Sequence, residues 1–290
     1  MGKGNKMNKK LLNKKRNKIF LIVLIFFVLA FTPLLIYSNY HIEVENITFK
    51  NKDIPEAFNG TRIAHLSDYH NHGGKYDDRL VRVVADSEPD YIFITGDMVD
   101  RSFTNTDKTN SFLKKISSIA PCYLVWGNHE MEIEASELEK IKSCAESCGI
   151  SILNDDFTRL YKDNEYISVT GNYNYIEAVT GYGKDEFNIW LHHFPEDFEM
   201  IADSTGKSGH QMDLMFSGHA HGGLIGLPFV GGLIAPGQGI FPEYISGIYE
   251  YNGSSMIVSR GVGNSSTTLR LFNPFHVVIC TLESSVKSYS

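Results

Sequence analysis

An unbroken apolar run near the N-terminus is the strongest hydrophobic pattern in the chain. It covers residues 19–37, reads IFLIVLIFFVLAFTPLLIY and contains no charged side chain. A helix rises about 1.5 Å per residue, so this run would span about 28 Å, close to the thickness of the hydrocarbon core of a bilayer. We therefore expect one N-terminal transmembrane helix over residues 19–38.

Beyond residue 42, short β-branched runs alternate with stretches of helical periodicity. The runs that predict strands lie at 62–66, 91–95, 122–126, 166–170, 188–192 and 212–216. The stretches that predict helices lie at 77–87, 109–119, 135–148 and 195–203. After Gly247 the pattern predicts further strands at 248–251, 256–259 and 276–282. No Pro-, Gly- or Ser-rich linker divides these elements, so we expect a single mixed α/β domain.

The sequence before the apolar run carries a topology signal. Eight of the first eighteen residues are Lys or Arg, and none is acidic. Because positively charged flanks stay in the cytoplasm, we expect a basic cytoplasmic tail at 1–18, a signal-anchor at 19–38, and a connector with the first strand at 39–58 outside. A cleaved signal peptide has the same order of segments. The run is long for that class and no A-x-A site follows it, which favours an uncleaved anchor.

The part of the chain after the anchor is acidic. The formal net charge of the whole chain is −7, and removing the eight positive charges of the tail leaves −15. A surface of this sign repels polyanions unless bound cations or a basic groove intervene, so nucleic acid is not expected as a partner.

Four cysteines, Cys122, Cys144, Cys148 and Cys280, are too few and too irregularly spaced for a disulfide scaffold or a zinc ribbon. We expect thiols packed in the core, with a disulfide as the alternative if the domain lies outside the cytoplasm.

Polar clusters follow five of the predicted strands at the points where the strands end. They read DYH at 68–70, GDMVD at 96–100, GNHE at 127–130, HHFP at 192–195 and GHAHGG at 218–223. Each cluster alone is also typical of a helix cap, a turn or a surface histidine. The carboxyl ends of strands are, however, where α/β sheets build ligand sites. Three of the clusters, GDMVD, GNHE and GHAHGG, contain glycine, which would let the backbone approach a small site closely, so together the clusters predict one polyvalent site.

The ordered signatures D-x-H, G-D-x-x-D, G-N-H-E, H-x-P and G-H-x-H-G-G resemble those of the calcineurin-like metallophosphoesterases. The resemblance covers nearly all of residues 60–283. The stretch 218–228 and the RGVG turn at 260–263 are similar to the bacterial membrane-linked branch of YaeI- and YkuE-type phosphodiesterases, although Leu224 stands where that branch often has Gln. The resemblance implies a metallophosphoesterase-type αββα sandwich of two mixed sheets, with a catalytic domain over 59–290.

The resemblance also implies two metal ions that share one carboxylate. One ion would be held by Asp68, His70, Asp97 and His221, and the other by Asp97, Asn128, His193 and His219. A carboxylate can bridge two cations through its two oxygens, which suits Asp97. His192 is the alternative to His193, which has the family's spacing before Pro195. The mixed N/O donor set fits Mn, Fe, Zn or Co better than Ca.

In the family, the residue at His129 is not a ligand. It would face the phosphate and stabilise or protonate the leaving oxygen. Asp100 would either support the ligands or cap a helix. Two metals about 3.5–4 Å apart lower the pKa of a shared water, so hydroxide would attack phosphorus in line. The expected function is therefore a two-metal phosphodiesterase or phosphomonoesterase.

A catalytic domain on the outer face of the cell membrane would meet envelope or lipid-linked phosphate esters, and these are the expected substrates. Two alternatives remain: a nuclease, which the acidic charge disfavours, and an inactive metal-holding binding domain, which the complete ligand set disfavours. Tyr69, Trp126, Tyr173, Tyr175 and Phe194 lie near the motifs, where either lining the cleft or packing in the core would suit them.

Overall fold

The computed structural model of the protein describes residues 3–171, 186–223, 226–227, 231–265 and 270–285. Tyr173, Tyr175 and Leu224, which the sequence singled out, lie outside these residues.

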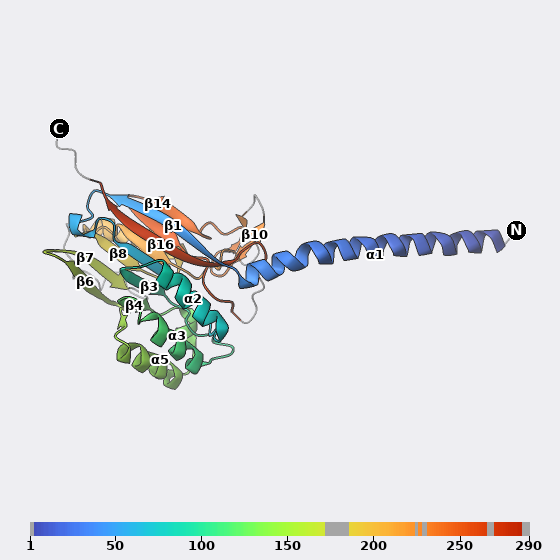
Figure 1. Ribbon diagram of the computed structural model, residues 1–290. Helices are drawn as coiled ribbons and strands as arrows, with labels where there is room; N and C mark the ends of the chain where they lie inside the picture. The colour runs from blue at the N-terminus through green and yellow to red at the C-terminus, as the bar shows by residue number, and fades with distance from the viewer. Residues whose placement is uncertain (1–2, 172–185, 224–225, 228–230, 266–269, 286–290) are drawn as a thin grey trace.

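Helix α1 (Lys3–Tyr40) projects as one continuous helix from one end of the folded body (Figure 1). In the described part of the chain it is the one helix long and apolar enough to cross a membrane. Its large apolar side chains are exposed, with Phe20 at 67% and Leu29 at 69%. Pro33 lies inside the helix without ending it. The expected apolar helix is therefore present, and most of its large apolar side chains are exposed.

The first of two six-stranded sheets has the strand order β1-β16-β2-β3-β4-β5. Its strands are β1 (Ile42–Asn51), β16 (Phe275–Ser284), β2 (Arg62–Leu66), β3 (Tyr91–Thr95), β4 (Cys122–Val125) and β5 (Ser151–Ile152). All neighbours are parallel except β16 and β2. The short helix η1 (Glu56–Phe58) lies between β1 and β2 in the chain. The carboxyl ends of β2, β3 and β4 therefore meet at one end of the sheet.

The second sheet has the order β14-β15-β9-β8-β7-β6. Its strands are β14 (Gly247–Tyr251), β15 (Ser254–Val258), β9 (Leu214–Ser217), β8 (Asn188–Leu191), β7 (Glu165–Gly171) and β6 (Asp156–Lys162). The four central strands are parallel, and β14 and β6 are antiparallel to their neighbours. Two mixed sheets, as the sequence predicted, thus form the domain.

Helices cover the outer faces of both sheets. Figure 1 shows α2 (Lys75–Asp86), α3 (Thr106–Ile116) and α5 (Ala135–Ser147) together on one side of the first sheet. On the second sheet, η3 (Pro195–Asp197) leads into α6 (Phe198–Ser208). Helix α4 (Asn128–Glu132) is a single short turn after β4. Two small hairpins, β10–β11 (Gly226–Leu227 and Gly231–Gly232) and β12–β13 (Ile234–Ala235 and Gly239–Ile240), follow β9.

Three apolar cores fill the spaces between these layers. One joins the helices to the first sheet through residues such as Leu80, Phe112 and Ile92. A second lies between the sheets, where Phe93 meets Phe216 at 5.5 Å between ring centroids. The third packs α6 on the second sheet around Trp190. Three cores between four layers are the αββα sandwich that the sequence predicted, because each sheet is buried on both faces. All four cysteines are free thiols; Cys122, Cys144 and Cys280 are buried as the core-thiol interpretation expects, and Cys148 is half-buried.

Candidate metal centre

The predicted site residues all follow the carboxyl ends of strands. Asp68 and His70 follow β2, Asp97 follows β3 and Asn128 opens the helix after β4, while His193 follows β8 and His219 and His221 follow β9. Backbone hydrogen bonds join these loops. The amide of Asp68 donates to Gly96 O and that of His70 to Asp97 O, each at 3.0 Å, and Gly218 N donates to His193 O at 3.2 Å. The two sheets therefore bring residues from five loops to one place.

One group of donor atoms consists of Asp68, His70 and His221, all of them buried. The Nε2 atoms of His70 and His221 lie 3.3 Å apart. Asp68 Oδ1 is 3.5 Å from His221 Nε2 and 3.9 Å from His70 Nε2. Three donor atoms thus converge from two different sheets.

A second group consists of Asp97, His193 and His219. His193 Nε2 lies 3.3 Å from Asp97 Oδ2, 3.1 Å from His219 Nδ1 and 3.2 Å from Asn128 Oδ1. Asp97 Oδ2 is also 3.8 Å from His70 Nε2 of the first group. The Asp97 carboxylate therefore stands between the two groups.

The chemistry of these donors fits metal ions. Imidazole nitrogens and carboxylate oxygens that converge in a buried space carry lone pairs with too few protons to share among them, and a cation satisfies them together. Burial lowers and Asp97 raises the pKa of His193, and the net shift is upward, to about 10. A buried imidazole that holds its proton so strongly indicates an excess of negative potential at this point.

The two adjacent histidines after β8 point in different directions. His193 Nδ1 lies 2.6 Å from Thr95 O, which turns its Nε2 toward Asp97. His192 Nε2 instead lies 2.8 Å from Asp197 Oδ2. Of this pair, only His193 belongs to a donor group in the described residues.

A backbone hydrogen bond determines the tautomer of His129. Its Nδ1 accepts a hydrogen bond of 3.0 Å from the backbone N–H of Arg101. Because a backbone N–H can only donate, the neutral His129 ring carries its proton on Nε2. That Nε2 lies 3.8 Å from Asp97 Oδ2, so His129 also falls into a donor group with His70 and Asp97. In this tautomer, however, Nε2 carries the proton, so His129 is a hydrogen-bond donor toward the site.

Two further carboxylates hold the loops. Asp100 Oδ1 accepts from Ser102 N at 2.8 Å and from Phe103 N at 3.3 Å, so it caps a turn, while Asn105 caps the following helix. Glu130, which the sequence analysis left without a role, is fully buried. It accepts from the backbone amides of Asp97, Val99 and Gly127 at 2.8–3.0 Å. In the sequence, only its position as the last residue of the GNHE motif indicated that Glu130 belongs to the site.

The backbone at the cluster is unusual. Five of the seven proposed ligands have positive φ: Asp68, His70, Asp97, His219 and His221, at 48–64°. Non-glycine residues rarely adopt this region, at a cost of about 1 kcal/mol or more each, and such residues concentrate at functional sites. Gly218 shows how close the loops are, because a Cβ there would lie 2.6 Å from Asp68 Oδ2.

Comparison with known proteins agrees with this geometry. Residues 61–223, more than half of the chain, match the calcineurin-like phosphoesterase family. The chain belongs to this family. It is 27% identical over 261 residues to the metallophosphoesterase YkuE of Bacillus subtilis, covering 84% of this chain and 86% of the relative. It is also 27% identical over 274 residues to YkoQ of the same organism (87% and 96%), and 27% identical over 188 residues to the phosphodiesterase YaeI of Escherichia coli (62% and 65%).

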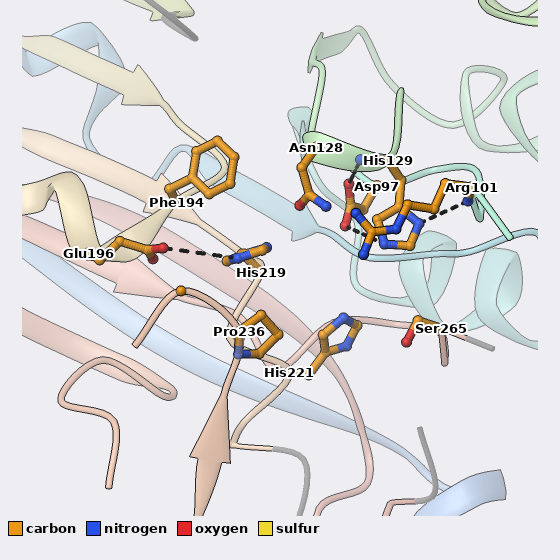
Figure 2. A pocket seen from close by; sticks show the side chains of 11 residues that line it. Asp97, Arg101, Asn128, His129, Phe194, Glu196, His219, His221, Pro236 and Ser265 are labelled. Carbon is orange, nitrogen blue, oxygen red and sulfur yellow. Dashed lines mark hydrogen bonds and ion pairs between the residues drawn. The ribbon is translucent and has the colours of Figure 1, made fainter. Parts of the chain in front are cut away.

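This metallophosphoesterase, a metal-dependent phosphoric ester hydrolase, has a cavity of about 440 Å³ over the cluster. Figure 2 shows the lining side chains facing a common space. Besides the predicted residues, it is lined by Arg101, Phe194, Glu196, Pro236, Gly237 and Ser265. Most of these come from loops whose course the sequence did not predict.

The aromatic residues near the motifs divide between the two expected roles. Phe194 lines the cavity of the metallophosphoesterase. Tyr69 is fully buried and stacks on Phe112, with ring centroids 4.3 Å apart. Trp126 is 7% exposed and packs in the core of the first sheet. Tyr69 and Trp126 therefore support the ligand loops from the core of the first sheet.

Proposed function

We propose that this protein is a two-metal phosphodiesterase or phosphomonoesterase whose ions share Asp97. The position of the Asp97 carboxylate between the two donor groups carries this proposal. The proposed ligands are Asp68, His70, Asp97 and His221 for one ion, and Asp97, Asn128, His193 and His219 for the other. The nitrogen and oxygen donors suit Mn, Fe, Zn or Co.

When bound, two such ions lower the pKa of a water molecule and neutralise phosphoryl oxygens. The chain's own residues would then position the ester. His129 Nε2–H would donate to the phosphoryl group or to the leaving oxygen, since Arg101 N occupies its Nδ1. Asp100 would act indirectly, through the turn that carries Arg101 and Phe103. Glu130 would hold the loops of Asp97 and Asn128 at a fixed separation.

We further propose that residues 1–18 form a cytoplasmic tail and 19–38 a membrane anchor, followed by a connector with the first strand at 39–58. The catalytic domain, 59–290, would then lie on the outer face of the cell membrane. The exposed apolar helix α1 and its basic flank support this layout. Envelope or lipid-linked phosphate esters would be the accessible substrates, and the acidic charge of the domain makes nucleic acid an unsuitable one.

The test compares two histidines that stand close together in the site. The full chain, purified in detergent, is assayed for metal content and for hydrolysis of a chromogenic diester beside the monoester. His219→Ala should lose one metal and the turnover with it. His129→Ala should keep both metals and lose about 10²-fold or more in kcat, with a smaller loss for good leaving groups.

Two outcomes would contradict the proposal. Loss of metal in His129→Ala would remove its role as a proton donor. Stoichiometric metal with no turnover of either ester in the unmodified chain would favour a metal-holding binding domain.

A further inference from the structure

The junction between α1 and the domain has no linker. The apolar run ends at Tyr37 and strand β1 begins at Ile42. Ser38, in the last turn of α1, is already 1% exposed and so packed in the domain. If α1 spans a membrane, the domain must therefore lie directly against the membrane surface, within a few residues of the hydrocarbon.

Asn39 fixes the direction in which α1 leaves the domain. Its Nδ2 donates to Leu35 O within the helix and to Arg270 O in the domain, both at 2.8 Å. Its Oδ1 accepts from Asn264 Nδ2 at 3.1 Å. Arg270 is a fully buried cation whose Nη2 donates to Gly263 O at 2.8 Å. These bonds attach the helix end rigidly to the loop at 260–265.

The helix joins the domain at the end that carries the metal centre. Ile42 of β1 pairs with Phe275 of β16, which runs antiparallel to β2. The start of β1 thus lies at the carboxyl end of β2, where Asp68 stands. Asn264, which holds Asn39, lines a cavity of about 240 Å³ together with His70. The opening of the site therefore lies at the same end of the domain as the C-terminal end of α1.

Three large apolar side chains stand exposed around this end, and we name them the apolar rim: Phe103 at 74%, Ile240 at 69% and Phe241 at 67%. Phe103 lines the cavity that His70 and Asn264 share. Ile240 ends the hairpin β12–β13, whose turn at Pro236 and Gly237 lines the metal cavity. Exposed apolar side chains of this size, gathered around a polar opening, are typical of a surface that meets a partner or a membrane.

We propose that the apolar rim inserts into the bilayer beside α1 and holds the opening of the metal centre against the lipid head groups. The substrate class that follows is the phosphate ester of a lipid still embedded in the membrane. This inference rests on the proposed function and on α1 spanning the membrane. The occupant is the membrane because Phe103 lines a cavity with Asn264, which bonds Asn39 in the last turn of α1, and the absence of a linker keeps this end of the domain at the surface.

The docking is tested without any substrate. A tryptophan is introduced by Phe241→Trp or Phe103→Trp into the full chain, which is reconstituted in phosphatidylcholine vesicles with brominated acyl chains. The native Trp126 and Trp190 are 7% and 0% exposed and give the background. Tyr161→Trp is the matched control, because Tyr161 is 67% exposed on the hairpin β6–β7 at the opposite end of β7 from the metal centre.

The rim reporters should be quenched by the brominated lipid well above the background, and the Tyr161→Trp control should not. Equal quenching of Phe241→Trp and Tyr161→Trp would overturn the proposal. Protection of Phe241→Trp from acrylamide without lipid quenching would mean that another copy of the chain covers the rim, which also overturns it.

The substrate class is tested with two esters that share the reacting group, p-nitrophenyl methyl phosphate in solution and p-nitrophenyl hexadecyl phosphate in the same vesicles. Replacing all three rim residues by Ser should lower the ratio of hexadecyl to methyl ester turnover by about tenfold or more. The double change Tyr161→Ser with Tyr166→Ser should leave that ratio unchanged. An unchanged ratio in the rim variant contradicts a lipid substrate. If the unmodified chain turns over neither of these diesters nor the chromogenic monoester, the proposed function is contradicted and the quenching result alone decides the docking.

Discussion

At the scale of single residues, contacts between neighbouring loops hold the proposed ligands in place. The motifs named every member of the two donor groups, because each ligand follows the end of a predicted strand. They did not predict the positive φ of Asp68, His70 and Asp97. Those conformations are set by contacts between loops, such as the hydrogen bond from His70 N to Asp97 O, which join residues far apart in the chain. Glu130 was missed for the same reason, since its partners lie on another loop.

A buried histidine near the site should make the fold sensitive to acid. His65 in β2 is fully buried with Nε2 at 2.8 Å from Thr95 Oγ1, and burial lowers its pKa to about 3. The unfolded chain takes up a proton near pH 6.5 while the folded chain does not, so stability is retained above that pH and falls as the pH drops from 6.5 toward 3. The loss for this group approaches about 1.4 kcal/mol per pH unit.

The measurement is the free energy of unfolding between pH 7 and pH 4.5. His65→Leu, which cannot titrate, should give a shallower dependence on pH than the unmodified chain, whatever its stability at neutral pH. Parallel slopes for the two proteins would refute this origin of the acid sensitivity.

Among the elements, those with strong periodicity were predicted and those without it were not. Strands β2 and β3 have the predicted bounds, because they are apolar runs buried on both faces. Helix α3 begins three residues earlier than predicted, since Asn105 caps it by accepting from Lys108 N at 3.1 Å. The edge strand β6 was missed because DFTRLYK is mostly polar. Two-residue strands such as β12 and β13 are too short to show a period.

An aromatic contact is one of the interactions by which helix α3 supports the first ligand loop. Phe112 stacks on Tyr69, whose hydroxyl accepts from Gly73 N and donates to Asp77 Oδ1, each at 2.9 Å. Phe112→Ala should cost about 3–5 kcal/mol of stability and also weaken metal binding, because Tyr69 lies between Asp68 and His70.

Phe187 provides the matched control for this prediction. It is 1% exposed in the core between the two sheets, where its ring centroid lies 6.1 Å from that of Phe49. Phe187→Ala should be destabilising to a similar degree with metal affinity retained, as measured by thermal unfolding and metal titration. Equal metal affinity in the two variants would show that the contact between Phe112 and Tyr69 does not hold the ligand loop.

For the whole molecule, the basic residues before the apolar run predict its orientation. Eight positive charges precede the apolar run, so the N-terminus should lie in the cytoplasm and the domain outside. Protease added to intact protoplasts should release a soluble, active fragment that begins after about residue 40. Because Ser38 and Asn39 are packed against the domain, cleavage is expected to be slow. If digestion requires detergent, the domain faces the cytoplasm.

The proposed function depends on two metal ions joined by one carboxylate, and the metal content of Asp97→Asn tests this most directly. Replacing one oxygen by an amide nitrogen removes the bridge, so Asp97→Asn should fall well below the occupancy of His70→Ala, which affects one ion only. Asp213→Asn is the control, because Asp213 is a buried aspartate that accepts from Asn188 N at 2.8 Å, away from the cluster. We predict two metal ions per chain in the unmodified protein and in Asp213→Asn, and loss of both metals and of turnover in Asp97→Asn. Full metal occupancy and activity in Asp97→Asn would contradict the shared site.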